Sequence, residues 1–94
     1  MTHRSQKLRD AARGRDCQIR LPSVCNFDPS TTVLAHYRLA GISGLGMKAP
    51  DEIGSWACSA CHAYVDTHKD DATARAFLEG VLRTQARLIK EGVL

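Results

Sequence analysis

The C-terminal quarter of the chain has hydrophobic residues at the spacing of an amphipathic helix. Apolar side chains recur at that spacing and fall on one side of such a helix: Phe77, Val81, Leu82, Leu88 and Ile89. Asp70 or Asp71 can cap its N-terminus, and Gly92 is suited to its C-terminal end. The pattern predicts a helix over 70–91 that packs against the rest of the domain through these apolar residues.

The middle of the chain predicts two strands separated by a loop. Residues 32–39 are β-branched and apolar, and 53–57 form a second segment able to return alongside them as a hairpin. Residues 41–50 contain three glycines and a proline, which predict a loop between the strands. A short helix is expected over 59–67, immediately after the second strand.

The N-terminal third is less regular. Residues 5–13 predict a short helix, and 17–25 predict a short extended pair with a turn near Pro22. Because strands and helices are both expected in a chain of one-domain length, we expect a single α+β domain over 1–94. Within it, 1–14 would form a basic N-terminal segment.

Four cysteines are a large number for so small a chain. The sequence has 94 residues, of which only 5% are aromatic, so the core is small and an additional staple is expected. Cys58 and Cys61 form a CxxC pair, whereas seven residues separate Cys17 from Cys25. Two pairs separated by a long insert are typical of a tetrahedral Cys₄ site, so structural zinc is the predicted cofactor.

Other uses of the cysteines remain open from sequence. They can be buried without a ligand, or they can form two disulfides, which a reducing cytoplasm disfavours. The run from Cys58 to His62 (CSACH) also matches the CxxCH pattern of haem attachment. Haem would leave Cys17 and Cys25 without a role, and residues 1–20 lack the apolar stretch of an export signal.

Positive charge is concentrated near the N-terminus. The net charge is +3, and residues 1–20 alone contain six Lys or Arg against two Asp. Such a segment is either a solvated tail or a patch that binds phosphate, and the sequence leaves both open. No apolar run is long enough to span a membrane, and we expect a cytoplasmic protein.

Two histidines and their neighbours suit phosphodiester hydrolysis. His36, within the first strand, is the candidate general base because imidazole titrates near neutral pH. His62 follows the CxxC pair, and Asp66 lies one turn later on the same helical face, so both can bind one Mg²⁺ or Mn²⁺ ion. Arg38 is on the same side of the strand as His36, where it can clamp a phosphate oxygen or remain solvated.

Three segments carry a resemblance to known nucleases: 11–26 (AARGRDCQIRLPSVCN), 33–41 (VLAHYRLAG) and 57–62 (ACSACH). Together they resemble HNH endonucleases, the ββα-metal or His-Me finger type, and more closely the short phage and prophage nucleases of the YbcO type. The resemblance extends over nearly the whole chain. It implies that the cysteines hold structural zinc, that His36 is the general base and that His62 binds the catalytic ion. The implied substrate is double-stranded or branched DNA.

The chain departs from the HNH pattern just before the base. Ala35 stands where many such enzymes have an acidic metal ligand, and Asp51 or Glu52 is the nearest polar counterpart of their middle asparagine. His68 joins the site only if the short helix ends near Thr67. The missing ligand keeps a second interpretation open, a non-catalytic zinc module that binds DNA or protein. The sequence also leaves a homodimer possible, because one small active site needs a second copy of the chain to cut both strands of a DNA duplex at once.

Overall fold

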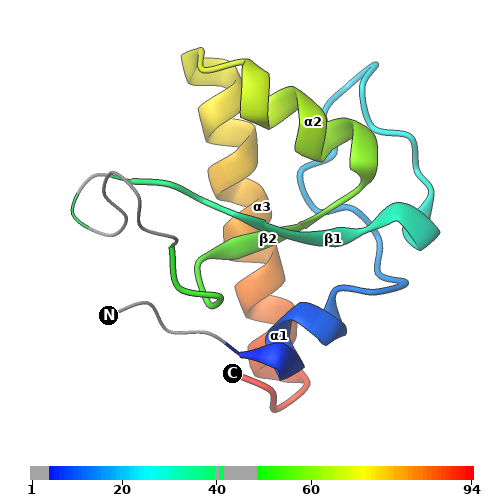
Figure 1. The fold of residues 1–94 in the computed structure, drawn as a ribbon, viewed down its shortest axis with the longest axis vertical. Coiled ribbons are helices and arrows are strands. Elements are labelled where there is room, and N and C mark those ends of the chain that lie inside the picture. The colour runs from blue at the N-terminus through cyan, green and yellow to red at the C-terminus, as the bar shows by residue number, and fades with distance from the viewer. Residues whose placement is uncertain (1–4, 40, 42–48) are drawn as a thin grey trace.

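The computed structural model describes residues 5–39, 41 and 49–94 (Figure 1). These residues form a small α+β fold with one two-stranded sheet and three α-helices. The elements in chain order are α1 (Gln6–Ala11), a 3₁₀ turn (Pro29–Thr31), β1 (Val33–His36), β2 (Gly54–Ala57), α2 (Ser59–Thr67) and α3 (Asp71–Lys90). Strands β1 and β2 pair antiparallel, with Val33 opposite Ala57 and His36 opposite Gly54. The predicted order of strands and helices is confirmed.

The segment 17–25 differs from its prediction, because it forms turns instead of an extended pair. The amides of Val24 and Cys25 both donate to the Leu21 carbonyl, which closes a tight turn between the two cysteines. Strand β1 is also shorter than the predicted 32–39. Most of the predicted loop over 41–50 lies outside the described residues.

Helix α3 packs along β2 through small and medium side chains. Its buried face consists of Thr73, Gly80, Val81, Thr84 and Leu88. A Cβ atom at Gly80 would lie 2.6 Å from the Ser55 hydroxyl oxygen, so glycine permits the close approach of helix and strand. The prediction that Leu82 and Ile89 face the core is wrong, since they are 57% and 62% exposed. The close approach at Gly80 fixes the helix rotation and turns these two residues outward.

The edge of β2 that β1 does not cover is closed by two other hydrogen bonds. The Trp56 N–H donates to the Thr84 hydroxyl oxygen over 3.0 Å, and the Trp56 carbonyl accepts from the Gln18 N–H over 2.8 Å. Because an unpaired buried backbone group is costly, these bonds join β2 to α3 and to the cysteine-bearing turn. Trp56 is buried in a hydrophobic cluster with Leu8 of α1 and Leu88 of α3. This contact brings α1 near the C-terminal end of α3 (Figure 1).

No helix in the described part of the chain combines the length and the apolar character needed to cross a bilayer.

Replacing Thr84 by valine tests the edge contact. The substitution keeps the shape of the side chain but leaves the buried Trp56 N–H without an acceptor, which we expect to cost about 1–3 kcal/mol of unfolding free energy. Urea unfolding at saturating zinc measures the change. Thr67→Val, at an exposed position on α2, is the matched control and should stay within about 0.5 kcal/mol of the original protein. Equal loss in both variants would contradict a specific role for the Thr84 hydroxyl.

Candidate active site and metal centre

The four cysteines converge although two of them precede β1 and the other two follow β2 in the chain. Their Sγ atoms all lie within 4.8 Å of one another, and those of Cys25 and Cys58 are 3.8 Å apart. A tetrahedral zinc with Zn–S bonds of about 2.3 Å has S–S edges of about 3.8 Å, whereas a disulfide is about 2.05 Å long. All four are free thiols. The cluster can therefore hold one metal ion, and its geometry argues against paired disulfides.

Backbone amides donate to the sulfur atoms, as is common around bound thiolates. The Cys61 N–H donates to Cys58 Sγ over 3.3 Å at the first turn of α2, and the Phe27 N–H donates to Cys25. Burial raises the pKa of Cys58, but the amides of Cys61 and Asn26 outweigh it and lower the pKa to about 7. Burial and the neighbouring thiols raise the pKa of Cys25 and Cys61. Thiolates held this close together repel one another. A bound cation would relieve that repulsion, so the donor set fits a soft divalent metal.

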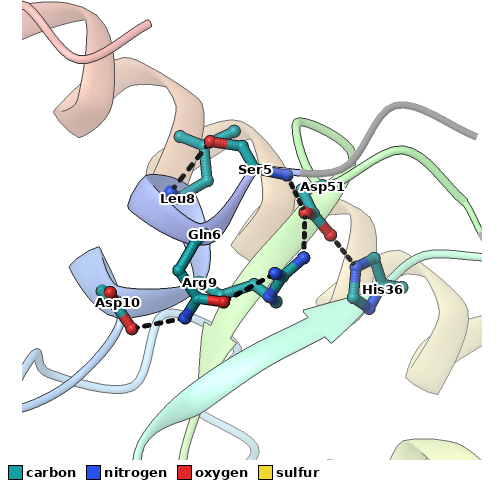
Figure 2. Close-up of polar contacts among 7 residues, drawn as sticks. All are labelled: Ser5, Gln6, Leu8, Arg9, Asp10, His36 and Asp51. Carbon is teal, nitrogen blue, oxygen red and sulfur yellow. Dashed lines mark hydrogen bonds and ion pairs between the residues drawn. The ribbon is translucent and has the colours of Figure 1, made fainter.

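His36 is the last residue of β1, and its ring is held by a buried carboxylate (Figure 2). His36 Nε2 lies 2.6 Å from Oδ1 of Asp51, which is only 2% exposed. The other carboxylate oxygen accepts a hydrogen bond from Arg9 Nη1 at 2.8 Å and one from the Ser5 N–H. Of the two polar candidates that sequence offered near the base, the geometry selects Asp51 over Glu52.

The electrostatics of Asp51 keep it ionised at neutral pH. Burial pulls the pKa of this carboxyl upward, but the hydrogen bonds from His36 and the Ser5 N–H, with the Arg9 charge, lower it below its usual value. An ionised carboxylate only accepts hydrogen bonds, so His36 donates through Nε2, and in the neutral ring the lone pair is then on Nδ1. This is the arrangement that prepares an imidazole to accept a proton and then stabilises the imidazolium.

Helix α1 is part of this site, which sequence reasoning missed. Ser5 caps α1, and Arg9 lies on the same helix, where Gln6 also binds its guanidinium over 2.8 Å (Figure 2). The ion pair joins residues 42 positions apart in the chain. No local sequence motif predicts such a contact. The excess of Lys and Arg in residues 1–20 was the only feature of the sequence that drew attention to Arg9.

A cavity of about 300 Å³ opens beside His36. Arg38 shares its wall with His36; Asp66 near the end of α2 and the residues His68 and Lys69 that follow it also line the cavity. His68 reaches this cavity because α2 ends at Thr67, which was the condition for its participation. The ionisable lining is mostly basic, as an anionic substrate requires.

The proposed ligands of the catalytic ion are less closely gathered. His62 Nε2 is 3.7 Å from Asp66 Oδ2, as expected for neighbours one turn apart. Asp66 lines the cavity, but His62 is not among its lining residues. Among the described residues, the cysteines form the only group of three or more potential ligands close enough to hold one ion. Two protein ligands leave coordination sites for water and for phosphate oxygens.

Comparison with known proteins assigns the chain to a family. Residues 6–93 match the family described as "Putative nuclease YbcO". The chain belongs to this family. Two curated members, each called a putative nuclease YbcO, come from Escherichia coli K12 and from Enterobacteria phage 82. Each is 55% identical to the chain in an alignment of 91 residues that covers 93% of this chain and 95% of the relative.

A solved structure is also similar to this YbcO-family chain. It is described as a putative bacteriophage protein from Escherichia coli K-12 and is 47% identical, with a TM-score of 0.74. The match covers 92% of this chain and all of the other. The family name supports a nuclease function and therefore a nucleic-acid substrate.

Two arginines near the N-terminus of this YbcO-family chain are bound within the fold. Arg9 is bound to Asp51, and Arg15 pairs with Glu91 while its guanidinium lies 4.6 Å from the centre of the Trp56 ring. Both guanidinium groups are thus committed within the fold. Arg4 lies outside the described residues.

The hydrogen bonds predict opposite tautomers for two histidines. Neutral His36 should carry its proton on Nε2, facing Asp51, whereas His68 should carry it on Nδ1, which faces the Tyr64 carbonyl at 3.1 Å. Long-range ¹⁵N NMR of the imidazole rings, at a pH where both are neutral, distinguishes the two forms. Asp51→Asn should weaken the preference at His36 and leave His68 unchanged. A His36 proton found on Nδ1 would contradict the proposed dyad.

Proposed function

We propose that this chain is a metal-dependent endonuclease that hydrolyses phosphodiester bonds in DNA with His36 as general base. The observation that carries the proposal is the buried Asp51 carboxylate bonded to His36 at the wall of a basic cavity. A histidine that is merely structural does not need a buried, ionised partner that is itself fixed by Arg9. The family relationship adds the substrate class.

In this mechanism His36 Nδ1 takes a proton from the attacking water, and Asp51 stabilises the resulting imidazolium. The water oxygen bonds to phosphorus as the bond from phosphorus to the 3′-oxygen breaks. Arg38 and Lys69, both at the cavity wall, can neutralise the phosphate oxygens. A divalent ion such as Mg²⁺ or Mn²⁺, held by His62 and Asp66, would supply charge stabilisation for the leaving oxygen.

The proposal includes an HNH-like, ββα-metal architecture. Strands β1 and β2 followed by α2 supply the two strands and the helix of that plan, with His36 on the first strand and His62 at the start of the helix. Asp51 takes the place of the middle asparagine, with a side-chain carboxylate as the orienting group. Ala35 leaves the ion one protein ligand short of the usual set, so this chain depends more on substrate oxygens.

Cleavage of supercoiled plasmid DNA in Mg²⁺ or Mn²⁺ tests the proposal. We expect His36→Ala to lower the rate by about 10²–10⁴-fold, the usual contribution of a general base. Asp51→Asn should lower the rate constant more than the affinity for DNA, because it acts through His36. His3→Ala, at the histidine to which no role is assigned, is the matched control. Equal cleavage by the His36 and His3 variants would exclude the mechanism.

We also propose that the cysteine cluster holds structural zinc. The four sulfurs link the turn before β1 to the start of α2, so the ion would join two parts of the chain that are far apart in sequence. In small domains of this kind, the apparent free energy of zinc binding is about 10–16 kcal/mol and is available only in the folded state.

Cys58→Ser should therefore lose zinc and unfold, whereas His36→Ala should keep both zinc and fold. Metal analysis by mass spectrometry and circular dichroism of the two purified variants measure this division. Removal of zinc from the original protein with a strong chelator should reproduce the Cys58→Ser spectrum. A folded, zinc-free Cys58→Ser protein would refute a structural role for the metal.

A non-catalytic zinc module is the second candidate function. It is favoured by Ala35 and by the absence, among the residues with described positions, of a preformed three-ligand site other than the cysteines. It predicts DNA binding that weakens with salt and is unchanged by His36→Ala, without any cleavage.

A further inference from the structure

The cavity beside His36 is larger than a phosphate group requires. Its volume is about 300 Å³. One water molecule takes up about 30 Å³ of the liquid, so this space equals roughly ten water volumes. A phosphate group, one phosphorus atom with its oxygens, fills only part of that space. The cavity therefore has room for a further group of the substrate, next to the phosphate that is attacked.

Two aromatic rings contact each other in the wall of this cavity. Tyr37 follows the end of β1 and Phe77 lies on α3; their ring centres are 5.0 Å apart and the ring planes are at 68° to each other. Both side chains are partly exposed, and this edge-to-face contact holds the two rings in place before any substrate binds. Val65 and Ala74 extend the apolar part of the lining. Such a wall suits a flat aromatic group and gives nothing to a phosphate.

A third ring, the imidazole of His68, also lines the cavity. The Tyr64 ring lies parallel to it, with 3.7 Å between the ring centres and 1° between the planes. His68 Nδ1 is also 3.1 Å from the Tyr64 carbonyl oxygen. Tyr64 is not among the lining residues, so it supports the imidazole from outside the cavity. Rings held by β1, α2 and α3 thus meet at one site.

Positive charge lines the same cavity. Arg38 and Lys69 are both exposed, and within the part of the chain that the structure describes neither has a carboxylate partner. Lys69 Nζ donates to the Val65 carbonyl oxygen over 3.0 Å, which holds the ammonium group at the end of α2. Asp66 is the one carboxylate of the lining. Cationic side chains beside aromatic rings are the combination by which proteins bind single-stranded nucleic acid.

We propose that this cavity receives one unpaired nucleobase of the DNA substrate, next to the phosphate that His36 attacks. The base stacks on the wall formed by Tyr37 and Phe77, while Arg38 and Lys69 bind the phosphates on either side of it. A base within a duplex is stacked on both faces and paired along one edge, so it enters a cavity only by leaving the stack. The substrate class is therefore DNA with unpaired nucleotides at the cleavage position. This inference rests on the proposed nuclease function.

Binding of fluorescent oligonucleotides tests the preference without cleavage. In the absence of Mg²⁺ and Mn²⁺, we expect the zinc-loaded full chain to bind a short single strand about tenfold more tightly than the fully paired duplex of the same sequence. Fluorescence anisotropy measures both dissociation constants. Attraction between charges alone would give the opposite order, because the duplex has the higher charge density.

Phe77→Leu tests the stacking wall, because it keeps an apolar side chain and removes the aromatic face. We expect it to weaken single-strand binding by about five- to tenfold and to leave duplex binding unchanged. Tyr37→Leu should have the same effect and provides a second variant if the first does not fold. Leu78→Ala, at the next α3 residue, which is 45% exposed and outside the lining, is the matched control and should change neither affinity. Circular dichroism and zinc content verify the fold of each variant.

The inference is overturned if the original protein binds the duplex as tightly as the single strand, or if both folded leucine variants keep the original preference. Cleavage is scored separately, with His36→Ala as the reference. Duplex cleavage that depends on His36 but shows no advantage for unpaired DNA would overturn this inference and leave the proposed function standing. A clear single-strand preference that is lost in the leucine variants, without any cleavage, would support the base-binding cavity and remove only the hydrolytic mechanism.

Discussion

The convergence of four thiols from two distant parts of the chain, one before β1 and one after β2, is the contact on which this structure depends. Among the described residues the sheet has only two strands, which is too small to form a stable layer alone. The cysteine cluster connects the turn that precedes β1 to the first turn of α2. The Trp56–Thr84 and Gln18–Trp56 hydrogen bonds then hold α3 and the same turn against β2. An ion at the cluster would thus fix the framework that positions His36.

The site depends on a second long-range contact, between the N-terminal end of α1 and Asp51, which precedes β2. Arg9 and the Ser5 N–H hold the Asp51 carboxylate, and Asp51 in turn holds the His36 ring (Figure 2). Burial of Asp51 is tolerable only because each carboxylate oxygen has a donor. Helix α1 therefore fixes the carboxylate that orients the base, and His36 itself lines the cavity that is available to substrate.

Much of the fold follows from sequence, and the failures have identifiable causes. Helix α2 and strand β2 were predicted nearly to the residue, because the CxxC pair and the turn signals mark their ends. The rotation of α3 was mispredicted at Leu82 and Ile89, since a count of apolar residues ignores the close approach at Gly80 that sets the buried face. The cysteine cluster follows from spacing. The role of Arg9 does not, because a contact 42 residues apart leaves no periodic signal.

Zinc K-edge X-ray absorption of the purified protein tests the central contact most directly. We expect four sulfur neighbours at about 2.3 Å and no nitrogen or oxygen in the first coordination shell. A shell that contains imidazole nitrogen or water oxygen, or fewer than four sulfurs, would contradict the four-thiol centre and the framework built on it.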